Sequence, residues 1–286
     1  MKLKFIQLIV TTLLFLSCSC TQAAIDCTVT SLGFATAYAP TGVVPNTTQG
    51  TMNLSCFRQL ATDPTTLNYS IAVDNGIHST STQNRAQLNT SNRINYETYS
   101  DSGCSTLWAS GTANRITGSM SLGGFAATNV TVSYWGCITT ANQNVAAGSY
   151  TDTVTMTVRN TTLGTSLQNT STFPVTITNP ATCAITSIGS VAFGTYAAFR
   201  ATALTAPTSN IVLNCTSGLP YSLALDTTSG VVIGLNYSLA LSVTSSRGTG
   251  PGQTHTITGT MPANQAGTCA TGSCSGSDPH TLTITY

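Results

Sequence analysis

The sequence predicts an all-β protein made of two immunoglobulin-like β-sandwiches in tandem, the second of which lacks its last strand. Three observations lead to this fold. Short segments of alternating apolar and polar residues fill most of the chain, divided by clusters of Gly, Asn, Pro and Ser. A cysteine spacing recurs once in each half, and a strand at residues 171–179 closes the first half but has no counterpart at the end of the second. No segment has the pattern of an amphipathic helix.

The chain begins with a pattern typical of a secretory signal peptide. Two lysines precede an apolar run at residues 5–16, and small residues flank the expected cleavage site after Ala23. Lipid attachment through Cys18 or Cys20 is the alternative, but the residues before either cysteine fit a lipid-attachment box poorly. We therefore expect residues 1–23 to be removed on export.

The charge of the mature chain is close to zero. Removing the two lysines of the signal from nine basic residues leaves seven arginines against eight acidic residues. A net charge of −1 argues against nucleic acid or an anionic membrane surface as a partner. Charged residues are only 6% of the chain, but hydrophobic residues reach 41% and alternate, which favours a folded protein over a disordered one.

Eight cysteines remain after the signal, and an even number in an exported chain predicts disulfides. They are Cys27, Cys56, Cys104, Cys137, Cys183, Cys215, Cys269 and Cys274. Cys27 to Cys56 spans 29 positions and Cys183 to Cys215 spans 32, each pair linking an opening strand to the next. The repetition favours pairing within each copy, although spacing alone leaves the connectivity open.

The strand endings of the two halves align. Residues 138–158 match residues 260–286, and both segments carry Ala-Asn-Gln ahead of a threonine-rich strand. The first half then continues into residues 171–179, where Phe173, Val175 and Ile177 point to one face. We expect this segment to be the fused last strand of a domain at residues 24–179, and residues 180–286 to form a second domain with an open groove.

A sandwich without its last strand exposes apolar core and unpaired backbone groups. Burying each of the three apolar side chains of such a strand contributes about 1.5–3 kcal/mol, so the second domain is expected to be unstable or aggregation-prone alone. A strand supplied by another chain would complete it. The alternative is that the second domain is simply shorter and that HTLTITY is an ordinary terminal strand.

These residues resemble the spore coat protein U domain family, the pilin type of archaic (Csu-like) chaperone–usher fimbriae. The resemblance covers essentially the whole mature chain in two copies. Its carriers are the two early cysteine pairs, the turn Phe193-Gly194-Thr195-Tyr196, the Ala147–Asp152 entry to a threonine-rich strand, and the segment STFPVTITNPATC. The second copy departs from the pattern through a Cys269–Cys274 insertion and Ser277-Asp278-Pro279, which leaves the form of its last loop open.

The resemblance implies a two-domain tip adhesin, with an N-terminal receptor-binding domain and a C-terminal pilin domain joined to the next subunit by donor-strand complementation. It implies a periplasmic pilus chaperone, an outer-membrane usher and an adjacent pilin that donates a strand. It also implies export to the periplasm and then an extracellular place at the pilus tip. Only Ala24-Ile25-Asp26 precede Cys27, so this subunit is expected to receive a strand but to donate none. A structural pilin or spore-coat-like subunit without receptor binding is the alternative.

Counting alternating strands places three loops, at residues 58–67, 118–129 and 159–168, at the pole of the first domain that lies away from the second. The apolar residues in or beside these loops are Leu60, Leu122, Phe125, Leu163 and Leu167. The resemblance suggests that they attach the pilus to hydrophobic or host surfaces, since exposed apolar patches mark contact sites. The alternative is that they plug the end of the sandwich. A sugar site at Trp108 or Trp135 is a rival, although a tryptophan beside a disulfide more often packs in the core.

Enzymatic functions are disfavoured, and neither a cofactor nor a metal is expected. His78, His255 and His280 lie apart in the sequence without ligand-spaced neighbours. The chain has no GxSxG, no HExxH and no glycine-rich phosphate loop. A secreted hydrolase that uses carboxylates brought together in space remains the competing class, because two acids far apart in sequence can meet in a fold.

Overall fold

The computed structural model describes residues 25–39, 45–79, 84–89, 91–140, 143–162 and 164–286. The expected signal peptide at residues 1–23 lies outside the described residues. Within these ranges the regular structure is β-strand apart from one 3-10 turn, η1 (Thr112–Asn114). The all-β fold is therefore confirmed. In the same part of the chain, no helix has the length and hydropathy of a membrane span.

The first sandwich is a curled ten-stranded sheet. Its path runs β1-β3-β8-β6-β5-β9-β10-β2, with β4 paired to β7 and β9. The strands are β1 (Ile25–Ser31), β2 (Phe34–Ala37), β3 (Asn46–Arg58), β4 (Thr66–Val73), β5 (Asn84–Gln87), β6 (Arg93–Tyr99), β7 (Ile116–Ser121), β8 (Thr128–Ile138), β9 (Gly148–Asn160) and β10 (Ser166–Asn179).

The second sandwich is built from two separate sheets. One runs β11-β13-β18-β16-β15 with β12 beside β18, and the other has three strands in the order β17-β14-β19. The strands are β11 (Cys183–Ile188), β12 (Leu204–Thr205), β13 (Ser209–Cys215), β14 (Pro220–Leu225), β15 (Ser229–Val232), β16 (Leu235–Leu241), β17 (Ser245–Arg247), β18 (Gly250–Met261) and β19 (Leu282–Thr285).

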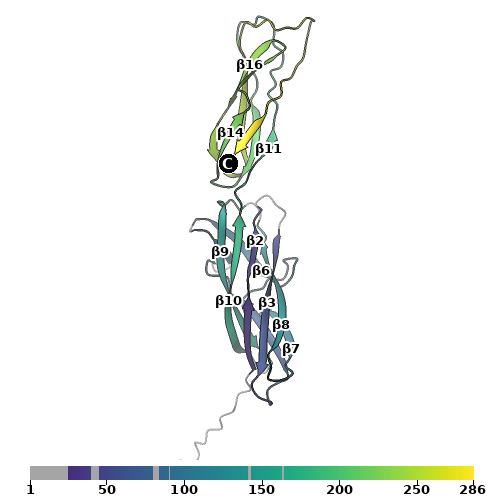
Figure 1. Ribbon diagram of the computed structural model, residues 1–286, viewed down its shortest axis with the longest axis vertical. Coiled ribbons are helices and arrows are strands. Elements are labelled where there is room, and N and C mark those ends of the chain that lie inside the picture. Colours follow the sequence, from purple (N-terminus) through teal and green to yellow (C-terminus); the bar gives the residue numbers. More distant parts are fainter. Residues whose placement is uncertain (1–24, 40–44, 80–83, 90, 141–142, 163) are drawn as a thin grey trace, which may run out of the picture.

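The two sandwiches lie end to end, and β10 points from the first toward the second (Figure 1). Only a short segment separates the end of β10 from the start of β11. Asn144 Nδ2 donates a hydrogen bond to the Thr249 carbonyl across the junction at 2.9 Å, and Ala146 forms a parallel bridge with Ser217. The far pole of the first sandwich therefore lies opposite this junction.

The alternation seen in the sequence becomes an inside and an outside face, as period-two strands require. In β10, Phe173, Val175 and Ile177 are buried, whereas Thr172 and Pro174 are exposed. Trp108 is 1% exposed, stacks on the Phe173 ring at 6.3 Å between centroids, and donates from Nε1 to the Ile71 carbonyl at 2.8 Å. A single aromatic core thus joins β10 to the rest of the first sandwich.

Four disulfides link the eight cysteines in neighbouring pairs. Cys27–Cys56 joins β1 to β3, and Cys183–Cys215 joins β11 to β13, at directly paired positions in each repeat. The remaining bridges are Cys104–Cys137 and Cys269–Cys274. The expected pairing within each copy is therefore present.

Candidate strand-acceptor groove and distal pole

Strand β10 is the element that closes the first sandwich. It pairs antiparallel with β9 along nearly its whole length and parallel with β2 on its other side, where Val175 lies opposite Phe34. Phe173, Val175 and Ile177 are at most 1% exposed. Residues 171–179 therefore lie inside the first sandwich, between two partner strands, and supply part of its core.

The second sandwich repeats the framework that surrounds β10 in the first. Phe34 contacts Tyr96 at 5.9 Å between ring centroids, and Phe193 contacts Tyr237 at 5.7 Å. An added Cβ on Gly136 would collide with Phe34, and one on Gly259 would collide with Phe193. The segment around Phe193 therefore takes the place of β2 on the second sandwich.

The two sandwiches each contain a tyrosine and a glutamine that make the same hydrogen bonds. Gln143 exchanges two hydrogen bonds with the Asn95 backbone, at 2.6 and 3.0 Å, and its own N–H donates to the Tyr38 hydroxyl. Gln265 does the same with the Asn236 backbone, at 2.6 and 3.0 Å, and its N–H donates to the Tyr196 hydroxyl at 3.2 Å. The repeated glutamine thus holds corresponding loops in the two sandwiches.

In the second sandwich the space that corresponds to β10 is an open groove of about 1160 Å³. Segment 188–198 forms one wall, and Leu282, at the start of β19, lies on the other. Within the described residues, segment 189–196 has no strand assignment and β19 pairs only with β14. Apolar side chains in the groove are only half-buried, among them Val191, Phe193, Leu225, Val232, Leu235 and Leu282.

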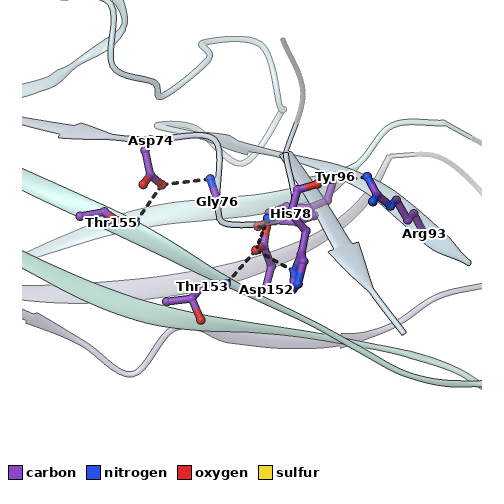
Figure 2. Close-up of polar contacts among 8 residues, drawn as sticks. All are labelled: Asp74, Gly76, His78, Arg93, Tyr96, Asp152, Thr153 and Thr155. Atoms are coloured by element: carbon purple, nitrogen blue, oxygen red, sulfur yellow. Dashed lines mark hydrogen bonds and ion pairs between the residues drawn. The ribbon is translucent and has the colours of Figure 1, made fainter. Parts of the chain in front are cut away.

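A buried carboxylate borders β10 in the first sandwich. Asp152, on β9 opposite Val175, accepts a hydrogen bond from the buried Tyr96 hydroxyl at 2.8 Å. Its other oxygen accepts from the backbone N–H groups of Thr153 and His78, at 2.8 and 3.2 Å. His78 Nδ1 lies 3.3 Å from the same oxygen, and Figure 2 shows the histidine and Thr153 converging on the carboxylate. Asp152 is therefore bound from several directions.

The phenol of this cluster remains a hydrogen-bond donor. Burial raises the pKa of Tyr96 far above its ordinary value, and the adjacent Asp152 carboxylate raises it further. Nearby, Asp74 Oδ1 accepts from the N–H groups of Gly76 and Thr155, both at 2.9 Å (Figure 2). The loop after β4 is thus fixed onto β9.

A corresponding but open cluster lies in the second groove. Tyr237 donates to Asp278 Oδ2 at 2.5 Å, its oxygen lies 2.5 Å from His280 Nε2, and His280 Nδ1 lies 2.8 Å from Asp226 Oδ1. The hydrogen bond from His280 lowers the pKa of Asp226, and burial, followed by the bond to Asp278, raises the pKa of Tyr237.

Strand register makes the two clusters equivalent. Val158 pairs with Ile71 on β4, and Ile284 pairs with Leu223 on β14. The Asp74 N–H bonds to the Thr155 carbonyl at 3.0 Å, as the Asp226 N–H bonds to the Thr281 carbonyl at 3.0 Å. Counting back three residues from each threonine places Asp278 where the first sandwich has Asp152. Spacing in the sequence did not reveal these clusters, because the bonds from Tyr237 to Asp278 and from His78 to Asp152 span 41 and 74 positions. The repeated Asn-Tyr pairs on β6 and β16 were the available signal.

The three loops at the far pole are bonded to one another. The Leu122 N–H donates to the Thr65 carbonyl at 2.7 Å, which joins the loop after β7 to the one before β4. The Asn68 N–H donates to Thr162 Oγ1 at 2.8 Å, which adds the loop after β9. Asp63 Oδ2 accepts from the Leu60 N–H at 2.7 Å and fixes that turn. The pole is therefore a connected surface.

The expected adhesive residues divide into two groups. Leu60, Phe125 and Leu167 are 41%, 61% and 58% exposed. Leu122 is 0% exposed and belongs to the core, so its assignment to an exposed contact was wrong: its backbone turns inward at the bond to Thr65 and its side chain plugs the sandwich. Leu163 lies outside the described residues. Trp108 is likewise buried and is not available to stack on a sugar.

No group of three or more His, Cys, Asp or Glu side chains able to hold a metal occurs among the described residues. The histidines lie apart: His78 contacts Asp152, His280 contacts Asp226, and His255 Nε2 lies 2.5 Å from the Tyr221 hydroxyl. Each of these contacts bonds one strand or loop to another.

Several solved structures are similar to this chain. The CsuC–CsuE chaperone–tip adhesion subunit pre-assembly complex from archaic chaperone–usher Csu pili of Acinetobacter baumannii contains a chain of 14% identity, with a TM-score of 0.45, covering 91% of this chain and 100% of that one. The CupB6 tip adhesin from Pseudomonas aeruginosa has 10% identity and a TM-score of 0.41, with coverage of 92% and 96%. No protein with a curated description matches the sequence at a significant level.

The model of the spore coat protein U domain family matches residues 6–157 and 169–238. These two stretches take in most of the first sandwich, with most of β10, and the second sandwich as far as Ser238 on β16. They include Cys27, Cys56, Cys183 and Cys215. The chain belongs to the spore coat protein U domain family.

Proposed function

We propose that this protein is the tip adhesin of a chaperone–usher pilus. Residues 24–179 form the adhesive domain, with residues 171–179 as its fused last strand, and residues 180–286 form the pilin domain. The pilin domain receives a strand from the adjacent pilin, and a periplasmic chaperone occupies the same groove before the outer-membrane usher exchanges it. The protein is thus exported to the periplasm and then displayed outside the cell.

One observation carries the proposal: the space filled by β10 in the first sandwich is open in the second, within the same framework. An extended strand with alternating apolar residues fits that space because β10 has that form. Addition of a strand to an exposed sheet edge combines backbone hydrogen bonds with pockets for alternate side chains. Family membership supports the proposal, since the family resembles the pilins of Csu-type fimbriae.

The far pole of the first sandwich is the proposed adhesive surface. Leu60 and Phe125 expose apolar side chains there on loops that hydrogen bonds hold together, and Leu167 does so at the start of β10. The pole lies away from the junction with the pilin domain, so it would face outward when that domain is joined to a fibre (Figure 1). Hydrophobic or host surfaces are the proposed partners.

Strand acceptance is tested with the full mature chain and a synthetic peptide of residues 169–179 added in trans. The expected result is a higher unfolding temperature for the second sandwich, because a ligand at 100 times its Kd stabilises the folded state by about 2.7 kcal/mol. A matched peptide with Phe173→Asp and Ile177→Asp keeps the length but loses the apolar face and should have no effect. An unchanged unfolding temperature with the first peptide would contradict strand acceptance.

Adhesion is tested separately with a Phe125→Ser, Leu167→Ser double variant in piliated cells. We expect normal numbers of pili and a strong loss of attachment to polystyrene. A matched variant, Thr172→Ser with Thr178→Ser, changes two exposed residues of β10 away from this apolar set and should attach normally. Unchanged attachment by the double variant would favour a structural pilin or coat subunit without receptor binding.

A further inference from the structure

We propose that the strand filling the second groove carries a hydrogen-bond-donating side chain opposite Asp278, at the position that Val175 occupies in the first sandwich. The inference rests on the proposed function of the groove as a strand acceptor. It goes further by stating the chemistry of one side chain of the entering strand. The Asp278 carboxylate of this chain would select that side chain.

The position follows from register. Asp278 lies where the first sandwich has Asp152, and the residue of β10 opposite Asp152 is Val175. A strand entering in the same register therefore presents one inward side chain to Asp278. Its neighbours two residues away on the same face correspond to Phe173 and Ile177, which cover the apolar core.

In the first sandwich both oxygens of the Asp152 carboxylate have hydrogen-bond donors without any contribution from a β10 side chain. Asp152 accepts from the Tyr96 hydroxyl and from the N–H groups of Thr153 and His78, and His78 Nδ1 adds a further polar contact. It is 3% exposed and satisfied from within. The apolar side chain of Val175 can lie opposite Asp152 because the carboxylate already has its hydrogen bonds.

In the second sandwich the same carboxylate has far fewer donors. Among the described residues, the Tyr237 hydroxyl is the only donor in hydrogen-bond contact with Asp278. The next residue is Pro279, which has no N–H to replace that of Thr153. The histidine of this cluster contacts Asp226 and Tyr237 instead of Asp278. Within the part of the chain that the structure describes, Asp278 Oδ1 thus has no hydrogen-bond partner.

Filling the groove changes the surroundings of this oxygen. Asp278 is exposed in the open groove and lines it beside Tyr237 and His280. A strand like β10 would remove water from the carboxylate, and leaving a buried charged acceptor unsatisfied is costly. A hydroxyl, amide or cationic side chain on the entering strand would supply the missing bond.

The test compares two peptides of residues 169–179, one with the natural valine and one with V175T. Valine and threonine have nearly the same shape, so the hydroxyl is the only substantial difference. We measure the Kd of each for the full mature chain by fluorescence anisotropy. The expected result is roughly tenfold tighter binding of the V175T peptide, the scale of one hydrogen bond to a charged group.

Two variants of the chain make the test specific. In Asp278→Ala the advantage of the V175T peptide should disappear. In the full chain, Val175→Thr should lower the unfolding temperature of the first sandwich, because Asp152 already has its donors and the buried hydroxyl gains none.

The outcomes separate the inference from the proposed function. Equal or tighter binding of the valine peptide to the unmodified chain overturns the inference while strand acceptance stands. Persistence of the V175T advantage in Asp278→Ala, or a stabilised first sandwich in Val175→Thr, also overturns it. Failure of both peptides to bind overturns strand acceptance and the inference together. If Asp278→Ala does not fold, the peptide comparison on the unmodified chain decides.

Discussion

The two sandwiches share a framework but differ in how far their cores are closed. Among the described residues, the first core has 28 buried hydrophobic residues and three half-buried ones packed against it. The second has 10 buried and 13 half-buried. Part of the difference lies at the groove of the second sandwich, which is lined by half-buried residues that include Val191, Phe193 and Leu235. One strand therefore separates the closed sandwich from the one with an open groove.

The largest expected effect comes from breaking the closure of the first sandwich with Ile177→Asp. Ile177 is 0% exposed, and an unpaired buried charge should cost more than 4 kcal/mol in the free energy of unfolding. Thermal unfolding followed by tryptophan fluorescence measures it, since Trp108 lies in this core. Thr172→Asp, on the exposed face of the same strand, is the control. Equal effects of the two changes would mean that the strand is not inside the sandwich.

A pair of truncations compares the two cores directly. Phe173→Ala should cost about 3–5 kcal/mol, because the ring is fully buried. Leu282→Ala on β19 should cost about 1 kcal/mol in the open sandwich, where the side chain is half-buried. With a strand peptide bound, the cost of Leu282→Ala should increase toward that of a buried leucine. A cost that does not depend on the peptide would show that the groove near Leu282 stays empty.

The two equivalent carboxylates should also differ. Asp152→Asn should destabilise by about 2 kcal/mol, because charge-assisted hydrogen bonds from Tyr96 and the backbone are weakened in a buried site. Asp278→Asn should change the stability of the open chain by less than about 1 kcal/mol, because that carboxylate is exposed. Urea unfolding of the two variants measures both. A larger cost for Asp278→Asn would contradict the assignment of the second cluster as the open one.

The smallest expected effect is a dependence on pH through Glu97. Burial raises the pKa of Glu97 to about 7 from 4.5, partly offset by a hydrogen bond from the Asn84 backbone. Because the folded-state pKa is the higher one, the first sandwich binds this proton more tightly than the unfolded chain does. Stability should therefore fall as pH rises from about 4.5 to 7.

Replacing this carboxyl by an amide should remove that dependence. Glu97→Gln is expected to raise stability at pH 8 by about 1 kcal/mol, allowing for solvent screening of a partly exposed group, and to leave it unchanged at pH 4. Urea unfolding at the two pH values gives the difference. A stabilisation of equal size at both would assign the effect to packing and not to ionisation.

Much of the closure could be predicted from the sequence, because it depends on local alternation. Phe173, Val175 and Ile177 alternate with polar residues, which identified an inward face, and the repeated Ala-Asn-Gln aligned the two halves. The same reasoning failed at Leu122, because the sequence of a loop does not show whether an apolar side chain is exposed or turned into the core. The Asp152 and Asp278 clusters could not be predicted from the sequence for another reason. Their members come together only through strand register, across sheets formed from distant segments.

The groove of the second sandwich is the centre of this account, and hydrogen–deuterium exchange of the full mature chain tests it most directly. Amides of β2 and β10 should be protected in the chain alone. Those of residues 193–196, and the outward amides of β19, should exchange quickly and become protected when the peptide of residues 169–179 is added. Slow exchange of residues 193–196 without any peptide, unchanged on its addition, would mean that the second sandwich is already closed.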